Sequence, residues 1–448
     1  MNAKKGVRAL SLLLVIALAG AMFVPAVSAE NNESKMEQHL LIDGMTNINV
    51  LNAQKTEDLI ASGIQSPEEL TIPQIITKYD MITFDIPDIK NELENFESLY
   101  ITIGNQKYSM KLTKADFSKV KDNIESYYGT LNGIENSEIF LTISDTVIVG
   151  SISIDSETFY VKPVEPRKRV SSEKPVLHII YSSNSVNQEK PIKIDDGTLE
   201  TPIIKDTKEL ISSNDGLSQE SRSVDSTKQW TTVNILITTD NQFYLDESDW
   251  KATAEDIINT ANSQSSFGRD DVQVSLCVVA YDDSKRMDLS NDPDITSEPL
   301  GTFYEHFDNN YLNARYADIA LYLGGYNADG GSQGLAWGFG NGPYWGQWAW
   351  SQMVYDDPLY TGTVHGRRCI SIHELGHIFN ADHENSAGTN RAYGWWDPLP
   401  KHTVMWSDFI EAYNVYEYSS IDYHGEATRN NALAIRNAKS TVATYRNS

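Results

Sequence analysis

The segment His373–His383 reads His-Glu-Leu-Gly-His-Ile-Phe-Asn-Ala-Asp-His and contains three histidines and one glutamate. On an α-helix, residues four apart lie on the same face, so His373 and His377 can direct their ring nitrogens towards one point. If the helix continued, His383 would lie roughly 15 Å from His373. The third histidine can therefore join the other two only if the helix ends after His377 and the chain turns back.

Asn380 lies where this turn must occur, and Asn is the non-glycine residue that most readily adopts the left-handed conformation used at helix C-termini. Three neutral imidazoles leave the fourth position of a tetrahedral Zn²⁺ open for water, which is typical of a catalytic site. Glu374 follows the first ligand and can act as general base and acid. The motif predicts one catalytic Zn²⁺ bound by His373, His377 and His383.

The pattern His-Glu-x-x-His-x-x-Asn-x-x-His resembles the zinc motif of metzincin peptidases, which usually have Gly at the position of Asn380. Metzincins also have a methionine turn beneath the metal, and Thr403-Val404-Met405-Trp406 resembles it; an ordinary core methionine is the alternative for Met405. Astacin-like and serralysin-like members have Tyr two residues later, where this chain has Ser407. The pattern therefore favours the reprolysin or ADAM-like branch.

The C-terminal half alternates strand and helix patterns, which predicts an α/β layout. We expect strands at Val233–Thr238, Val272–Ala280 and Asp318–Leu323, and helices at Trp250–Asn262 and Asn430–Tyr445. This order resembles the metzincin N-terminal subdomain, in which a mixed sheet covers the zinc helix. The predicted fold class is an α/β (α+β) metzincin-type catalytic domain over residues 229–448, preceded by a β-rich prodomain.

The segment Gly334-Leu-Ala-Trp-Gly-Phe-Gly340 falls where metzincins have the edge strand of the sheet. An edge strand has free N–H and C=O groups, and an extended substrate can pair with them. We expect substrate contacts at Gly334, Leu335, Ala336 and Trp337. A glycine-rich loop with core aromatics is the alternative.

Residues 30–204 are predicted to form a β-rich domain, because short β-branched runs alternate with turn residues there. The runs Tyr127–Gly133 and Ser137–Ile143 are similar to the propeptide of reprolysin-like peptidases, which implies an inhibitory domain removed on maturation. No cysteine lies between residues 30 and 230, so a cysteine switch is excluded. Residues 205–228 are polar and Ser-rich, as expected for a linker and maturation region.

Residues 1–29 have the pattern of a secretory signal: basic residues, an apolar run from Ala9 to Val24, and small residues before Glu30. We therefore expect a secreted, extracellular protein with no stable membrane span; an uncleaved anchor is the alternative. Removing the signal's three positive charges changes the formal charge from −26 to −29. Such acidity argues against a nucleic-acid partner.

Two further features leave alternatives open. Cys277 and Cys369 form either one disulfide or two buried thiols. An acidic group without the spacing of a known calcium loop forms either a Ca²⁺ site or, as we favour, a solvated loop. Its members are Asp282, Asp283, Asp288, Asp292 and Asp294.

These features predict a secreted zinc endopeptidase that is made as a zymogen and acts on proteins or peptides, with its own propeptide as intramolecular inhibitor. The alternative is a catalytically inactive exported binding or cell-surface protein on a metzincin scaffold. Retention of Glu374 argues against that alternative, because a purely structural zinc does not use this carboxylate.

Overall fold

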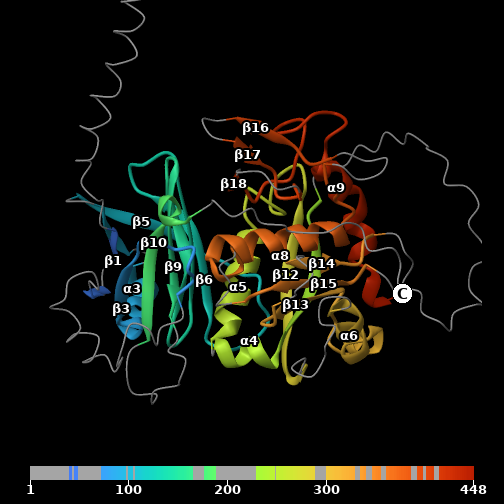
Figure 1. The fold of residues 1–448 in the computed structure, drawn as a ribbon, viewed down its shortest axis with the longest axis horizontal. Coiled ribbons are helices and arrows are strands. Elements are labelled where there is room, and N and C mark those ends of the chain that lie inside the picture. Colours follow the sequence, from blue (N-terminus) through green and yellow to red (C-terminus); the bar gives the residue numbers. More distant parts are fainter. Residues whose placement is uncertain are drawn as a thin grey trace, which may run out of the picture.

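The computed structural model describes residues 40–42, 45–48, 72–96, 99–103, 106–164, 176–187, 229–247, 249–287, 299–327, 333–339, 346–354, 360–384, 391–396, 400–407 and 413–447. The predicted signal at 1–29 and the predicted linker at 205–228 lie outside these ranges. No helix in the described part of the chain is long and apolar enough to cross a membrane. We call the described residues from 40 to 187 the N-terminal module and those from 229 to 447 the C-terminal module (Figure 1).

The N-terminal module is built on a ten-stranded sheet with the order β1-β4-β5-β6-β7-β8-β9-β10-β3-β2, in which every pairing is antiparallel. The strands are β1 (Leu40–Ile42), β2 (Met45–Ile48), β3 (Asp80–Phe84), β4 (Tyr100–Ile103), β5 (Gln106–Lys114), β6 (Glu125–Leu131), β7 (Ser137–Ile143), β8 (Ile148–Ile154), β9 (Glu157–Pro163) and β10 (Leu177–Ser182). The β8–β9 hairpin turns over two residues, and Asp155 there has a φ of 52°. Asp tolerates this left-handed backbone, which tight hairpins require.

The core of this module lies between the sheet and helix α3 (Ile86–Phe96). Alternate residues of the strands point to the same face, so β-branched and aromatic side chains form one continuous apolar layer. Ile89 and Leu93 of α3 pack against this layer and are buried with Ile139 and Ile152. The β-rich prediction for this part of the chain is consistent with the observed sheet.

The C-terminal module contains a five-stranded sheet with the order β12-β11-β13-β15-β14, parallel except for β14. Its strands are β11 (Thr231–Asp240), β12 (Val274–Met287), β13 (Ile319–Gly324), β14 (Gly334–Ala336) and β15 (Trp348–Gln352). Its helices are α4 (Asn241–Asp246), α5 (Trp250–Ala261), α6 (Pro299–His306), α7 (Asn309–Ala314), α8 (Val364–Ile378) and α9 (Asn431–Val442). This mixed α/β arrangement agrees with the predicted fold class.

Helices cover both faces of this sheet because successive strand residues point to opposite sides. Val233 and Ile235 of β11 pack in the same core cluster as residues of α5, α8 and α9. Leu236, the next residue, packs in a second cluster with α6 and α7. A small sheet, β16 (Gly394–Trp396), β17 (Pro400–His402) and β18 (Tyr413–Asn414), lies beyond α8 (Figure 1).

Glu255 of α5 is buried where the two modules meet. The hydroxyl of Ser126 on β6 donates to its Oε2 atom over 3.3 Å. Loss of solvent and the negative charge of Asp122 raise the pKa of Glu255 to about 7. The folded state therefore disfavours the ionised carboxylate.

This raised pKa predicts a pH-dependent loss of stability. Between pH 4.5 and 7 the unfolded chain releases the Glu255 proton while the folded chain retains it, so stability falls as pH rises. The Glu255→Gln variant has no such proton to lose. We therefore expect its free energy of unfolding to decrease by about 2–3 kcal/mol less than that of the wild type over this pH range. Urea unfolding at pH 5 and pH 8 measures it, with exposed Glu305→Gln as control. Identical pH dependence in the two variants would contradict the prediction.

Candidate metal centre and active site

Helix α8 supplies the first two predicted zinc ligands. The helix begins after Thr363, whose hydroxyl accepts a hydrogen bond from the N–H of Gly366 over 2.9 Å. It ends at Ile378, and Asn380 then adopts a φ of 67°, the left-handed conformation expected from the sequence. The Ala381 N–H donates to the Gly376 carbonyl over 2.9 Å and closes the helix end. The chain can then return His383 towards the helix.

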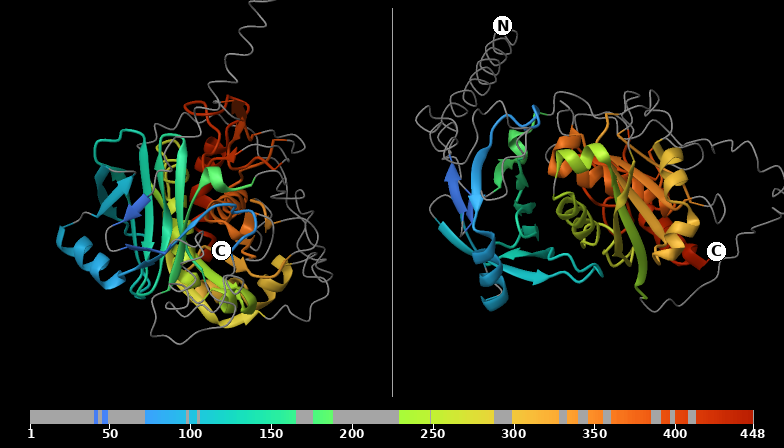
Figure 2. Two further views of the ribbon diagram at one scale, coloured as in Figure 1. Left: turned by 60° about the vertical axis from the view of Figure 1, so that its left-hand side comes forward. Right: turned by 90° about the horizontal axis from the view of Figure 1, so that it is seen from below.

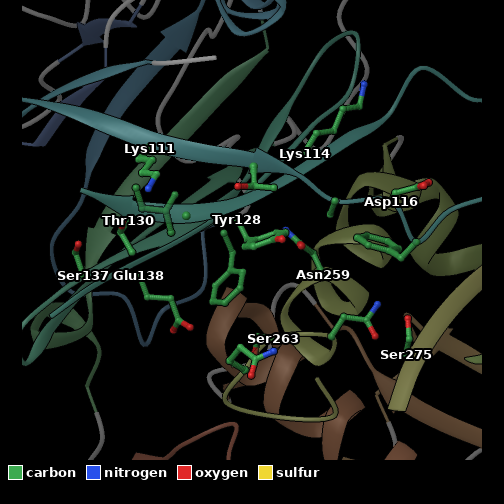
Figure 3. A pocket seen from close by; sticks show the side chains of 18 residues that line it. Lys111, Lys114, Asp116, Tyr128, Thr130, Ser137, Glu138, Asn259, Ser263 and Ser275 are labelled. Carbon is green, nitrogen blue, oxygen red and sulfur yellow. The ribbon is translucent and has the colours of Figure 1, made fainter. Parts of the chain in front are cut away.

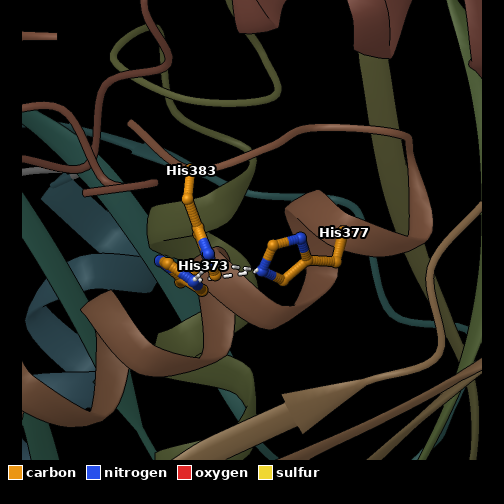
Figure 4. A group of neighbouring side chains, drawn as sticks. All are labelled: His373, His377 and His383. Carbon is orange, nitrogen blue, oxygen red and sulfur yellow. Dashed lines mark hydrogen bonds between the residues drawn. The ribbon is translucent and has the colours of Figure 1, made fainter. Parts of the chain in front are cut away.

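The structure brings His373, His377 and His383 together, with their Nε2 atoms facing one another (Figure 4). Nε2 of His383 lies 2.9 Å from Nε2 of both other histidines, and those two are 3.2 Å apart. A tetrahedral zinc ion with bonds of about 2.1 Å separates its ligand nitrogens by roughly 3.4 Å. The spacing is therefore close to that of a zinc ligand set.

The opposite ring nitrogens fix which tautomer these histidines adopt. Nδ1 of His373 lies 2.7 Å from the Val404 carbonyl, and Nδ1 of His377 lies 3.0 Å from the Ala381 carbonyl. Because a carbonyl can only accept, each Nδ1 must carry the proton. Each Nε2 then presents a lone pair to the centre of the cluster. In this tautomer the two imidazoles, together with His383, could hold a divalent metal through three Nε2 atoms.

Met405 lies against the middle of the zinc helix and is fully buried. A Cβ atom added to Gly376 would lie 2.6 Å from Sδ of Met405 and 3.0 Å from the Tyr418 ring. A larger residue at this helical position, between His373 and His377, would therefore force Met405 or Tyr418 to move. The carbonyl of Val404, the residue before Met405, orients His373. Met405 thus occupies the position expected of the methionine turn.

Glu384 connects the third histidine to the methionine turn, and the sequence analysis missed it. Its Oε2 accepts from the N–H of Ser407 over 2.9 Å, and its Oε1 accepts from the Ser407 hydroxyl over 3.1 Å. The adjacent His383 is thereby held in place. The position of Glu384 directly after His383 is the sequence feature that could have indicated its role.

Glu374 is fully buried and lies against the edge strand. A Cβ atom added to Gly334 would lie 2.7 Å from Cγ and 2.8 Å from Cδ of Glu374. Strand β14 pairs only with β15 in the five-stranded sheet and lies at its edge, as expected from the sequence. Beyond it, the Phe339 N–H donates to the His377 carbonyl over 3.2 Å, which joins this segment to the zinc helix.

The four residues expected to contact substrate have different surroundings. The side chains of Leu335 and Trp337 are buried in the core, and the Trp337 ring contacts Tyr304 and Trp348. Ala336 is half-buried. Any contact of Leu335 or Trp337 with a substrate would therefore use the backbone. Gly340 lies outside the described residues.

The two cysteines are free thiols, so the disulfide alternative is wrong for this structure. Cys277 lies on β12, and Lys119 is close to its thiol. Cys369 lies on α8, where its sulfur is 3.4 Å from Nε2 of His365 and 3.7 Å from the Asn414 carbonyl. The two thiols face different neighbours. Burial raises the pKa of Cys369, which keeps this thiol protonated.

Two spare histidines near the site have structural contacts. Burial lowers the pKa of His365 to about 3, and its Nδ1 lies 2.8 Å from the Tyr416 hydroxyl. Burial lowers the pKa of His402 to about 4, and its ring stacks on Trp406 with centroids 4.2 Å apart. Both are neutral at physiological pH.

Asp282 from the acidic group pairs with Arg315 over 2.9 Å. Asp288, Asp292 and Asp294 lie outside the described residues, as does the side chain of Asp283. The Ca²⁺ alternative therefore stays a prediction.

Residues 229–400 match a family model described as Reprolysin_5, Metallo-peptidase family M12. This match confirms the resemblance of this part of the chain to metzincin-like metallopeptidases. Among curated proteins, no relative matches the chain.

Two solved structures are similar in part. One is titled "Structure of a chaperone-substrate complex", with 21% identity, a TM-score of 0.35 and coverage of 48% of this chain and 35% of that chain. The other is titled "Crystal Structure of metalloproteinase-II from Bacteroides fragilis", with 13% identity, a TM-score of 0.41 and coverage of 71% of this chain and 86% of that chain.

The left-handed turn at Asn380 predicts opposite effects of two substitutions. Asn380→Gly should leave zinc affinity unchanged or raise it, because glycine adopts positive φ without steric cost. Asn380→Val should lower zinc affinity about tenfold, since a β-branched residue is strained by roughly 1–2 kcal/mol in this conformation. Competition with a chromophoric chelator measures both affinities. Equal affinities for Gly and Val would show that the turn does not control the metal site.

Proposed function

We propose that this protein is a secreted zinc endopeptidase made as a zymogen. The observation that carries the proposal is the convergence of three Nε2 atoms, two of them from the helix that also carries Glu374. The Glu374 side chain lies against Gly334 of the edge strand β14. The family match at residues 229–400 supports metallopeptidase chemistry. The signal-like residues 1–29 support secretion, and the Ser-rich segment 205–228 supports a maturation cut between the two modules.

The proposed mechanism assigns distinct tasks to the residues of the site. His373, His377 and His383 would hold zinc, which supplies polarisation of the scissile carbonyl and a lowered pKa for water. Glu374 would accept a proton from the attacking water and deliver it to the leaving amine. The substrate would pair with the backbone of β14, which places its scissile bond beside Glu374.

This assignment predicts a specific loss of activity in Glu374→Gln. The amide cannot accept the proton, so kcat on an unstructured protein substrate should fall at least about 100-fold. Zinc affinity should stay within about threefold of the wild type, because the three histidines are unchanged. The assay uses the full chain after cleavage within residues 205–228 and addition of zinc. Equal cleavage rates in the two proteins would refute the role of Glu374.

The contact between Gly334 and Glu374 gives a second test. In Gly334→Ala the added methyl group meets the carboxyl group of Glu374, so one of the two must move. We expect kcat to fall about tenfold or more, because small displacements of a catalytic group are costly. The control is Gly338→Ala, since nothing lies within 4 Å of a Cβ atom there. A similar kcat for both variants would argue against this placement of Glu374.

A further inference from the structure

The N-terminal half of α8 is buried although it contains charged residues. Every residue of α8 except His377 is buried, including His365, Arg367 and Arg368. A helix on the surface of a domain normally exposes its polar residues on one face. In Figure 1 and Figure 2 the N-terminal sheet lies beside the start of α8. The Tyr160 ring of this sheet contacts His365, and Ser151 contacts Arg368. Arg367 instead pairs with Glu247 of the C-terminal module.

Polar groups of the N-terminal module bind this half of the helix directly. The Tyr181 hydroxyl on β10 accepts from the N–H of Val364, the first residue of α8, over 2.9 Å. Lys162 on β9 donates to the Gly362 carbonyl over 2.8 Å, and Arg368 donates to the Ser151 hydroxyl over 2.6 Å. All three module side chains are buried. Adjacent strands of the module therefore hold the start of the zinc helix.

Arg368 also connects this contact to α5. Its guanidinium forms two hydrogen bonds to Asp256, over 2.8 and 2.6 Å. Both charges are thereby removed from water, with Ser151 satisfying a remaining donor. Separation of the modules would exchange this bond for one to water, so the bond contributes a modest net stabilisation to docking.

Helix α5 forms a second contact with the module. Asn259 donates to the Tyr127 carbonyl over 2.9 Å, and the Ser126 hydroxyl donates to Glu255. The Thr146 hydroxyl donates to Asp249, the residue before the helix. These bonds run along the length of α5.

A main-chain pairing adds a third contact. The Val278 N–H donates to the Phe117 carbonyl over 2.8 Å, and the Lys119 N–H donates to the Val278 carbonyl over 2.8 Å. The segment around Ser118 thus extends the five-stranded sheet beside β12. Phe117 is buried in the core cluster of the C-terminal module. The pairing is a single parallel β-bridge between the modules.

Apolar packing joins the two modules as well. Tyr160 and Tyr181 of the module share one buried cluster with Ala252 of α5 and Val364 of α8. Between the contacts lies a cleft of about 670 Å³, lined by polar residues of β5, β6 and β7 and of the end of α5 (Figure 3). Separation of the modules would expose the apolar cluster to water, which is unfavourable.

We propose, on the basis of the zymogen function proposed above, that the N-terminal module is a retained structural partner of the C-terminal module. It stays docked on α5 and α8 after the chain is cut within residues 205–228. Tyr181 and Ser151 accept hydrogen bonds from Val364 and Arg368 of α8. Both donors precede His373 on the helix. After the cut, the module remains bound and holds the start of α8.

The test uses the full chain with the Glu374→Gln substitution, so its outcome does not depend on peptidase activity. A recognition sequence for a specific protease replaces residues 218–223, and complete cutting is verified on a denaturing gel. Size-exclusion chromatography at about 1 μM and native mass spectrometry then follow. We expect one 1:1 complex with the mass of the uncut chain. Separate fragments, whether both folded or one precipitated, would overturn the proposal.

A matched pair of variants tests the contacts themselves. Tyr181→Phe retains the ring but leaves the buried Val364 N–H without its acceptor, so the dissociation constant of the cut complex should rise about tenfold. Tyr100→Phe removes an exposed hydroxyl on β4 and should leave the constant unchanged. Equal dissociation constants for the two variants would overturn the assignment of docking to the α8 contact.

Discussion

The convergence of three imidazole Nε2 atoms depends on how one helix ends. His373 and His377 are placed by helical geometry alone, whereas His383 needs a reversal of the chain within a few residues. The left-handed Asn380 provides that reversal. Backbone carbonyls then accept from the Nδ1 atoms of His373 and His377, which leaves the Nε2 atoms of these two histidines directed towards His383. The geometry of the site is therefore a consequence of backbone structure.

The sequence allowed this part of the molecule to be predicted because the interactions are local. The spacing of the histidines, the helix end and the preference of Asn380 for positive φ all lie within one short segment. The strands and α5 were predicted for a similar reason, since their apolar periodicity reflects immediate burial. Zinc binding and the catalytic role of Glu374 stay predictions.

Other features could not be predicted, because they depend on residues far apart in the chain. Nothing in a single sequence indicates that the Val404 carbonyl would orient His373, or that Ser407 would bind Glu384. The cysteines were undecided for the same reason: their separation depends on how β12 and α8 pack. The residues that form the contacts between the modules are separated by even more of the sequence, and no local motif predicts these contacts.

Helix α8 combines two environments that explain its unusual composition. Its second half contains His373, His377 and Gly376, which leaves room for Met405. Its first half contains Arg367 and Arg368. On a solvent-exposed surface these two arginines would need no partners. Both arginines are instead buried, Arg367 with Glu247 and Arg368 with Asp256. Buried charges persist only when their partners are fixed. The helix that carries His373 and His377 is thus connected to two buried ion pairs near its start, and through Arg368 to Ser151 of the N-terminal sheet.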